Sequence, residues 1–61
     1  MQGYMITEEI KVNERKTLIL HINPTTDKVH QVDIHISDSI IKEKIREPYG
    51  ISKEEAIREY S

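Results

Sequence analysis

The chain of 61 residues has no cysteine, phenylalanine or tryptophan, and only two glycines and two prolines. Without cysteine there is no disulfide framework, no thiolate zinc site and no thiol nucleophile. No run of about 18 apolar residues occurs, which argues against a membrane-spanning helix or a membrane partner. Residues 1–5 lack the basic and apolar regions of a signal peptide, so we expect a cytoplasmic protein.

Charge of one sign is also lacking. Nine Lys and Arg stand against eleven Asp and Glu, for a net charge of -2, and both signs are spread along the chain. There is therefore no polybasic arm of the kind that supplies non-specific nucleic-acid binding. A chain of this length is expected to form one small domain over residues 1–61.

The apolar residues that are present are mainly isoleucine. Eleven Ile stand beside two Leu, three Val and three Tyr. Isoleucine is stiff at its β-carbon and suits a pleated surface, so a strand-rich half is expected. Chains of about 60 residues bury only about 60% of their unfolded surface, which leaves a thin core. We therefore expect a homodimer, in which one apolar patch serves both subunits.

Three segments show the alternation of apolar and polar residues that predicts strands, at residues 4–12, 17–22 and 30–37. In the second segment Leu18, Leu20 and Ile22 share one face. In the third, Val32, Ile34 and Ile36 do the same. Asn23 and Pro24 between these two segments are typical of a turn, so the two strands are predicted to form a hairpin.

The register of this hairpin can be predicted from parity. The two apolar sets must lie on one face, so directly opposed residues must have numbers with an even sum. A loop of three residues (24–26) or five residues (24–28) meets that condition. A four-residue loop needs a β-bulge to correct the faces. We expect one of the odd loops.

After residue 37 the period changes to a helical one. Ile40, Ile41 and Ile45 fall at helical spacing. The second of the two prolines, Pro48, disfavours helical geometry at Glu47, so this predicted helix is about ten residues long. Ser37, Asp38 and Ser39 are competent N-caps for it. A second helix is predicted from Ser52 onward, where Ser52 and Glu55 form a capping-box pattern.

These elements predict an α+β fold, with a small antiparallel β-meander of two or three strands followed by two short C-terminal helices. The predicted core consists of Ile10, Leu18, Leu20, Ile22, Val32, Ile34, Ile36, Ile41, Ile45, Ala56 and Ile57.

The residues that carry chemistry are few. On the predicted register His21, Asp33 and His35 lie on the face opposite the leucines, where such a group can hold a metal or move a proton. Polar residues on an exposed sheet face explain the same pattern, and we expect no metal and no cofactor. No serine-nucleophile motif or glycine-rich phosphate loop is present. The chain is also too small to enclose a typical substrate pocket, so we expect no enzyme activity.

Residues 31–36 together with residues 50–59 resemble the ribbon-helix-helix family of DNA-binding regulators and antitoxins. The resemblance covers residues 31–60 and implies that two chains pair their strands into a ribbon that enters the major groove. It implies further that Gln31, Asp33 and His35 face the bases. The backbone amides near Ser52 and Lys53 would then contact phosphate.

Two functions from different classes are therefore open. The first is a small non-enzymatic binding protein, a protein–protein interaction or regulatory module that acts as a homodimer. The second is a ribbon-helix-helix-like DNA-binding transcriptional regulator or antitoxin. The predicted recognition face for a partner protein consists of Ile19, His21, Gln31, Asp33 and His35.

Overall fold

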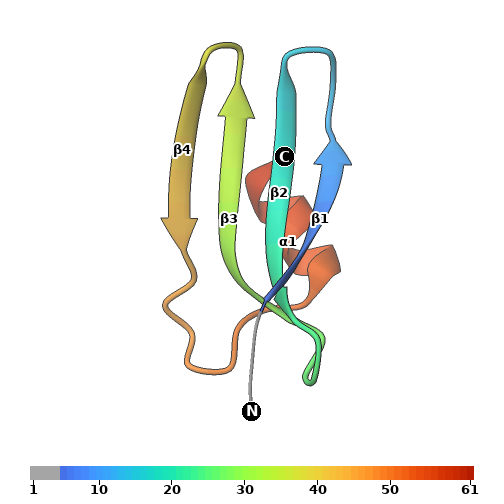
Figure 1. Ribbon diagram of the computed structural model, residues 1–61, viewed down its shortest axis with the longest axis vertical. Helices are drawn as coiled ribbons and strands as arrows, with labels where there is room; N and C mark the ends of the chain where they lie inside the picture. Colours follow the sequence, from blue (N-terminus) through green and yellow to red (C-terminus); the bar gives the residue numbers. More distant parts are fainter. Residues whose placement is uncertain (1–4) are drawn as a thin grey trace.

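A computed structural model describes residues 5–61 as an antiparallel sheet with a helix across one face (Figure 1). The elements are β1 (Ile6–Lys11), β2 (Lys16–Asn23), β3 (Lys28–Ile36), β4 (Ser39–Lys44) and α1 (Lys53–Tyr60). The strand order in the sheet is β1-β2-β3-β4, so each strand pairs with the next one along the chain. Residue 4, at the start of the first predicted strand, lies outside the described residues.

The helix predicted between residue 37 and Pro48 is wrong, because Ser39–Lys44 forms the edge strand β4. Residues 37 and 38 are the two-residue turn that leads into it, and Ser37 has a left-handed φ of 54°. Residues competent as helix caps are also good turn formers, and here the turn prevails. The predicted meander with two helices is thereby corrected to four strands and one helix in the described chain.

The hairpin of β2 and β3 has the predicted faces but not the predicted loop. Leu18 pairs with Ile34 and Leu20 pairs with Val32, as the parity rule requires. The loop nevertheless spans the four residues 24–27, because Asn23 pairs with Lys28. The register shifts beyond His21, where His30 is the extra residue of a β-bulge. The bulge returns both apolar sets to one face.

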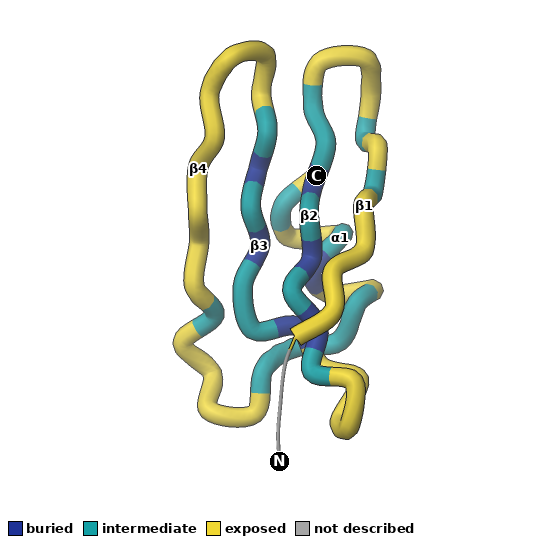
Figure 2. The backbone as a smooth tube through the Cα atoms, viewed as in Figure 1, coloured by how far each residue is buried: buried dark blue, intermediate teal, exposed yellow. Residues whose placement is uncertain are grey.

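The core lies between the two central strands and α1 (Figure 2). Its buried residues are Leu18, Leu20, Ile22, Val29, Val32, Ile34 and Ala56. Val29 is absent from the predicted core, and it turns inward because the bulge changes the parity of β3. Ile10, Ile45 and Ile57 pack against this core while only partly buried. The prediction that Ile36 and Ile41 are buried is wrong, since they are 38% and 44% exposed.

Helix α1 begins where the capping pattern predicts. The Glu55 backbone N–H donates to the Ser52 hydroxyl oxygen at 3.1 Å, which satisfies one amide of the first turn. Glu54 and Glu55 lie in that first turn, next to the positive end of the helix dipole. Ala56 is the buried residue of the helix, and the helix contacts β2 and β3.

Replacing Ser52 by Ala should lower the free energy of unfolding by about 0.5–2 kcal/mol, since the Glu55 amide loses its acceptor. Chemical denaturation followed by circular dichroism measures this change. Ser52→Asp keeps an acceptor at the cap and should stay close to the parent chain. An unchanged midpoint in Ser52→Ala would mean that the cap contributes nothing to α1.

The segment between β4 and α1 is fastened back onto β3 beyond the bulge. The Val29 N–H donates to the Ile51 carbonyl oxygen at 2.7 Å, and the Ile51 N–H donates to the Val29 carbonyl oxygen at 3.0 Å. Gly50, just before this bridge, has a left-handed φ of 77°. A β-carbon at Gly50 would lie 2.7 Å from the Val29 carbonyl oxygen, so glycine is required here by conformation and by space.

Replacing Gly50 by Ala should destabilise the fold by at least about 1–2 kcal/mol, the cost of a left-handed backbone for an L side chain. The close approach to Val29 adds to that cost. Ser37→Gly is the matched control, because it relieves a left-handed residue in the β3–β4 turn and should leave stability unchanged or higher. Equal denaturation midpoints for Gly50→Ala and the parent chain would contradict the bridge.

Candidate functional site

The face of the sheet opposite α1 is left uncovered by residues 5–61, and we call it the open face. Its centre is made by three opposed pairs from β2 and β3. These pairs are Thr17 with His35, Ile19 with Asp33, and His21 with Gln31. The structure therefore brings together all five residues of the predicted recognition face, and each of them is partly buried.

The two edge strands extend the open face on either side. From β1 it receives Thr7, Glu9 and Lys11, and from β4 it receives Ile40, Lys42 and Lys44. The contribution of β4 was missed from sequence, because this segment was predicted to be helical. The adjacent β-branched residues Ile40 and Ile41 are the sequence signal that favours a strand here. In a strand Lys42 and Lys44 then share one face.

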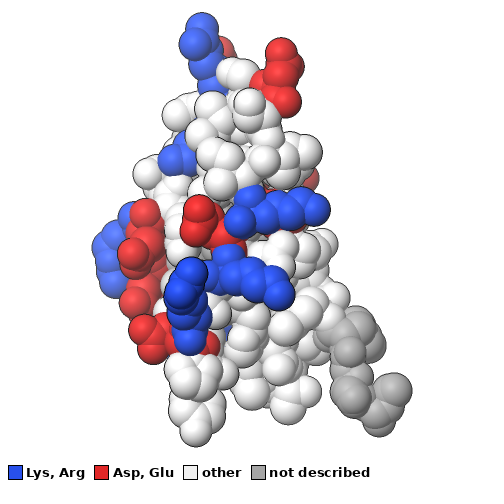
Figure 3. Space-filling view, turned by 90° about the vertical axis from the view of Figure 1, so that its left-hand side faces the viewer, with Lys and Arg blue, Asp and Glu red and all other residues white. Residues whose placement is uncertain are grey.

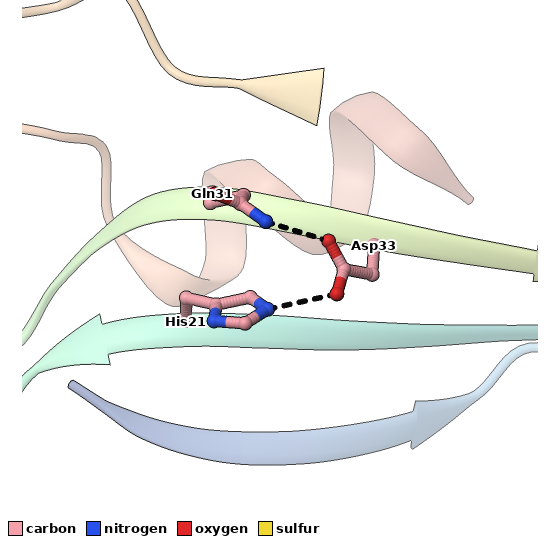
Figure 4. A network of polar contacts seen from close by, with 3 residues as sticks. All are labelled: His21, Gln31 and Asp33. Carbon is pink, nitrogen blue, oxygen red and sulfur yellow. Dashed lines mark hydrogen bonds and ion pairs between the residues drawn. The ribbon is translucent and has the colours of Figure 1, made fainter. Parts of the chain in front are cut away.

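A polar network lies at the centre of the open face (Figure 4). His21 Nε2 lies 3.0 Å from Asp33 Oδ2, and the Gln31 amide nitrogen donates to Asp33 Oδ1 at 2.8 Å. Both carboxylate oxygens of Asp33 thus accept a hydrogen bond. The side chains of His21 and Asp33 are only 26% and 14% exposed, so neighbouring side chains shield this contact from water.

The pKa of Asp33 lies below its ordinary value of 3.8. Partial burial by itself raises this pKa, because it penalises the charged carboxylate. The hydrogen bonds from Gln31 and His21, with the positive charges of His21 and Lys42, outweigh that penalty. Asp33 is therefore held as an anion, although it lies in the middle of a sheet face.

The depressed pKa of Asp33 predicts a pH-dependent contribution to stability. A carboxyl with a lower pKa in the folded chain stabilises the fold above its unfolded pKa of about 3.9, and loses this effect as the pH falls through the folded value. The parent chain should therefore be more stable than Asp33→Asn at neutral pH. The two unfolding free energies should converge as the pH falls below 3.8. Urea denaturation at a series of pH values measures the difference.

A second background serves as the control for this experiment. Gln31→Thr removes one donor to Asp33 and leaves His21 in place, so the pH-dependent difference should shrink but persist. A difference between the parent chain and Asp33→Asn that stayed constant from neutral to acidic pH would show that the network does not hold the carboxylate charged.

The network offers one fixed negative charge and the two groups that hydrogen-bond to it. A histidine held by an aspartate is two thirds of a hydrolytic triad, but within residues 5–61 the side-chain partner of His21 is Asp33 alone. No group of three or more His, Asp and Glu in the same part of the chain converges as a metal would require. The shielded anion and its two donors instead form a rigid polar centre within a surface that carries Ile19.

The predicted phosphate-contacting residues do not join this face. The Ser52 hydroxyl is occupied as the helix cap. Lys53 Nζ donates to Glu8 Oε1 at 3.2 Å, and Glu8 is paired with the buried Leu20 on the side of the sheet covered by α1. Ser52 and Lys53 therefore lie across the sheet from Gln31, Asp33 and His35.

Two surface hollows lie away from the network. One of about 300 Å³ runs between α1 and the segment after β4, with Glu43, Glu55, Glu59 and Tyr60 in its lining. Burial, followed by the charges of Glu59 and Glu43, raises the pKa of Tyr60. The other hollow, of about 420 Å³, lies beside the β2–β3 loop and is lined partly by His30 and Tyr49. Neither hollow includes a residue of the polar network.

No family model, curated protein or solved structure matches the chain. Within residues 5–61, α1 falls short of the length and apolar character that crossing a bilayer requires.

Proposed function

We propose that the protein is a non-enzymatic protein–protein interaction module that acts as a homodimer and recognises its partner through the open face. The observation that carries this proposal is the open face itself. The two central strands of the sheet present Ile19, an ordered His–Asp–Gln network and His35 on a side that no described element covers. Such a surface has shape and fixed polar groups but no enclosed volume, which suits a macromolecular partner better than a small substrate.

The charge on the open face favours an acidic partner segment. Lys11, Lys42 and Lys44 lie on this face against Glu9 and Asp33. Lys28, opposite Asn23, adds a further positive charge on the same side, so the open face is positive on a chain that is negative overall. In Figure 3, which looks onto the β4 edge, basic side chains cross the middle and acidic ones gather toward the α1 side at the left. This separation orients an acidic segment toward the open face.

Duplex DNA is the competing ligand, since phosphates also seek lysine. The ribbon-helix-helix arrangement implied a helix directly after residues 31–36, and β4 occupies that place. Gln31 and His35 do share an uncovered face with Lys42, which is the observation in favour of a DNA-binding regulator. Titrating the chain separately with an acidic peptide and with a DNA duplex distinguishes the two ligands.

NMR titration of the ¹⁵N-labelled chain with a decaglutamate peptide should shift backbone signals of β2, β3 and β4 that belong to the open face. A double variant, Lys11→Glu with Lys42→Glu, should weaken this binding about tenfold or more, since two attractive charges become repulsive. The matched control reverses two exposed basic residues on the α1 side, Arg46→Glu with Arg58→Glu, and should bind as the parent chain does.

A random-sequence duplex is titrated in parallel at low salt. Binding to the duplex that weakens steeply with salt, with none to the peptide, would support the DNA-binding regulator and overturn the acidic-partner proposal. Shifts confined to α1, or an absence of shifts with both probes, would remove the open face as the recognition surface.

A further inference from the structure

We propose that two copies of the chain join through their β4 edges, antiparallel and centred on Ile41, to form one continuous eight-stranded sheet. This inference rests on the homodimer in the proposed function and specifies how it is built. The rotation axis stands perpendicular to the sheet, so the two open faces lie on the same side. The pairing follows from the backbone, the exposed side chains and the charges of β4.

The backbone of β4 offers a regular set of free donors and acceptors. The Ile45 N–H donates to the His30 carbonyl oxygen at 3.0 Å, on the same register that pairs Ile41 with Ile34. In an antiparallel ladder the bonding direction alternates, so the odd-numbered residues of β4 point their backbone groups toward β3. Ile40, Lys42 and Lys44 then point theirs outward, as an edge strand does before another strand is added.

Three of the six large apolar residues that the described chain leaves exposed lie at or beside the same edge. Ile36, Ile40 and Ile41 are 38%, 57% and 44% exposed. Ile36 and Ile41 point to the helix side but lie beyond the contacts of α1 with β2 and β3, and Ile40 lies on the open face. The whole of β4 is exposed, as Figure 2 shows. In contrast, β1 contributes one exposed large apolar residue, Ile6. Its central residue Glu8 points to the helix side and is held by Lys53.

Strand length and charge together select one register from those that keep the faces aligned. Centring the pair on Ile40 would overlap only residues 39–41 of β4, whereas centring it on Ile41 overlaps residues 39–43. With Ile41 opposite Ile41 of the second copy, Ile40 opposes Lys42 and Ser39 opposes Glu43. Asp38 then opposes Lys44, so opposite charges meet at both ends of the interface. Centring the pair on Lys42 would place the two copies of this lysine directly opposite each other. Centring it on Glu43 would do the same with the two glutamates. Like charges directly opposite each other destabilise a sheet.

The attraction between Asp38 and Lys44 must act between chains. Asp38 lies in the turn before β4 and Lys44 ends that strand, so the length of β4 holds them about 20 Å apart within one chain, far beyond the Debye length of about 8 Å at physiological salt. The side chain of Lys42 can lie along Ile40 of the second copy and cover it with methylene groups. The two Ile41 side chains meet in a non-hydrogen-bonded pair, in which opposed side chains are closest.

Cysteine cross-linking tests this register directly, since the parent chain has no cysteine. Ile41→Cys should form a disulfide-linked dimer rapidly under mild oxidation, because opposed residues of such a pair lie within disulfide reach. Lys42→Cys and Glu43→Cys report the two registers excluded by charge, and Glu8→Cys, at the exposed centre of β1, reports pairing through β1. These three should cross-link slowly. Faster linking of any one of them than of Ile41→Cys would overturn the proposed register.

Sedimentation equilibrium of uncross-linked chains gives an independent measure. Ile41→Lys should raise the dimer dissociation constant about tenfold or more, since two ammonium groups then meet at the axis. Ile6→Lys is the matched control, because Ile6 is also 44% exposed but lies on β1, and it should dimerise as the parent does. Asp38→Lys or Lys44→Asp alone should weaken the dimer, and the double variant should restore it.

The outcomes separate this inference from the proposed function. A dimer whose dissociation constant is unchanged by Ile41→Lys and by the Asp38 and Lys44 charge exchange would refute the β4 pairing but not the homodimer. A chain that stays at 7.2 kDa at every concentration would refute both the pairing and the homodimer. Loss of decaglutamate binding with intact Ile41→Cys cross-linking would refute the open-face function alone.

Discussion

Within residues 5–61 one eight-residue helix has to provide a whole layer, and the rest of the described structure depends on that limit. The helix is too short to be stable alone, so it needs the Ser52 cap and the buried Ala56 to remain in place. It contacts β2 and β3, and the core is accordingly complete under those two strands. The edge strands fall outside its reach, which is why Ile36 and Ile41 stay exposed although their side chains point toward the helix side.

The central hairpin is the part of the fold most open to prediction, because parity governs both of its faces at once. The leucines of β2 must share a side with Val32 and Ile34, and this condition alone places His21, Gln31 and Asp33 together on the other side. The loop length does not follow from parity, because a bulge at His30 compensates a four-residue loop. The same bulge turns Val29 into the core and lets residue 51 pair with β3.

The prediction failed at β4 for a physical reason. An edge strand with one face toward solvent and the other beyond the reach of α1 has little need for alternation, and Ile40 beside Ile41 matches a helical period as well as a strand. Two adjacent β-branched residues favour a strand, but a free strand edge on β3 has to exist before that preference can be realised. The residues before β4, Ser37 and Asp38, are as typical of a helix N-cap as of a turn between two strands, so they do not distinguish a helix from a hairpin. The lysines that β4 adds to the candidate site were missed for this reason alone.

The open face and the β4 edge are compatible parts of one proposed assembly. An axis perpendicular to the sheet leaves both His–Asp–Gln networks on the same surface, and the sheet is continuous between them. Lys42 lies beside Asp33 within one chain, and its aliphatic part would also cover Ile40 of the second copy. A partner segment running across the junction would then meet two equivalent recognition faces. Two weak contacts on a rigid support bind more tightly than either does alone, because the second is made at a high effective concentration. A small chain with a thin core would in this way present a recognition surface twice its own size.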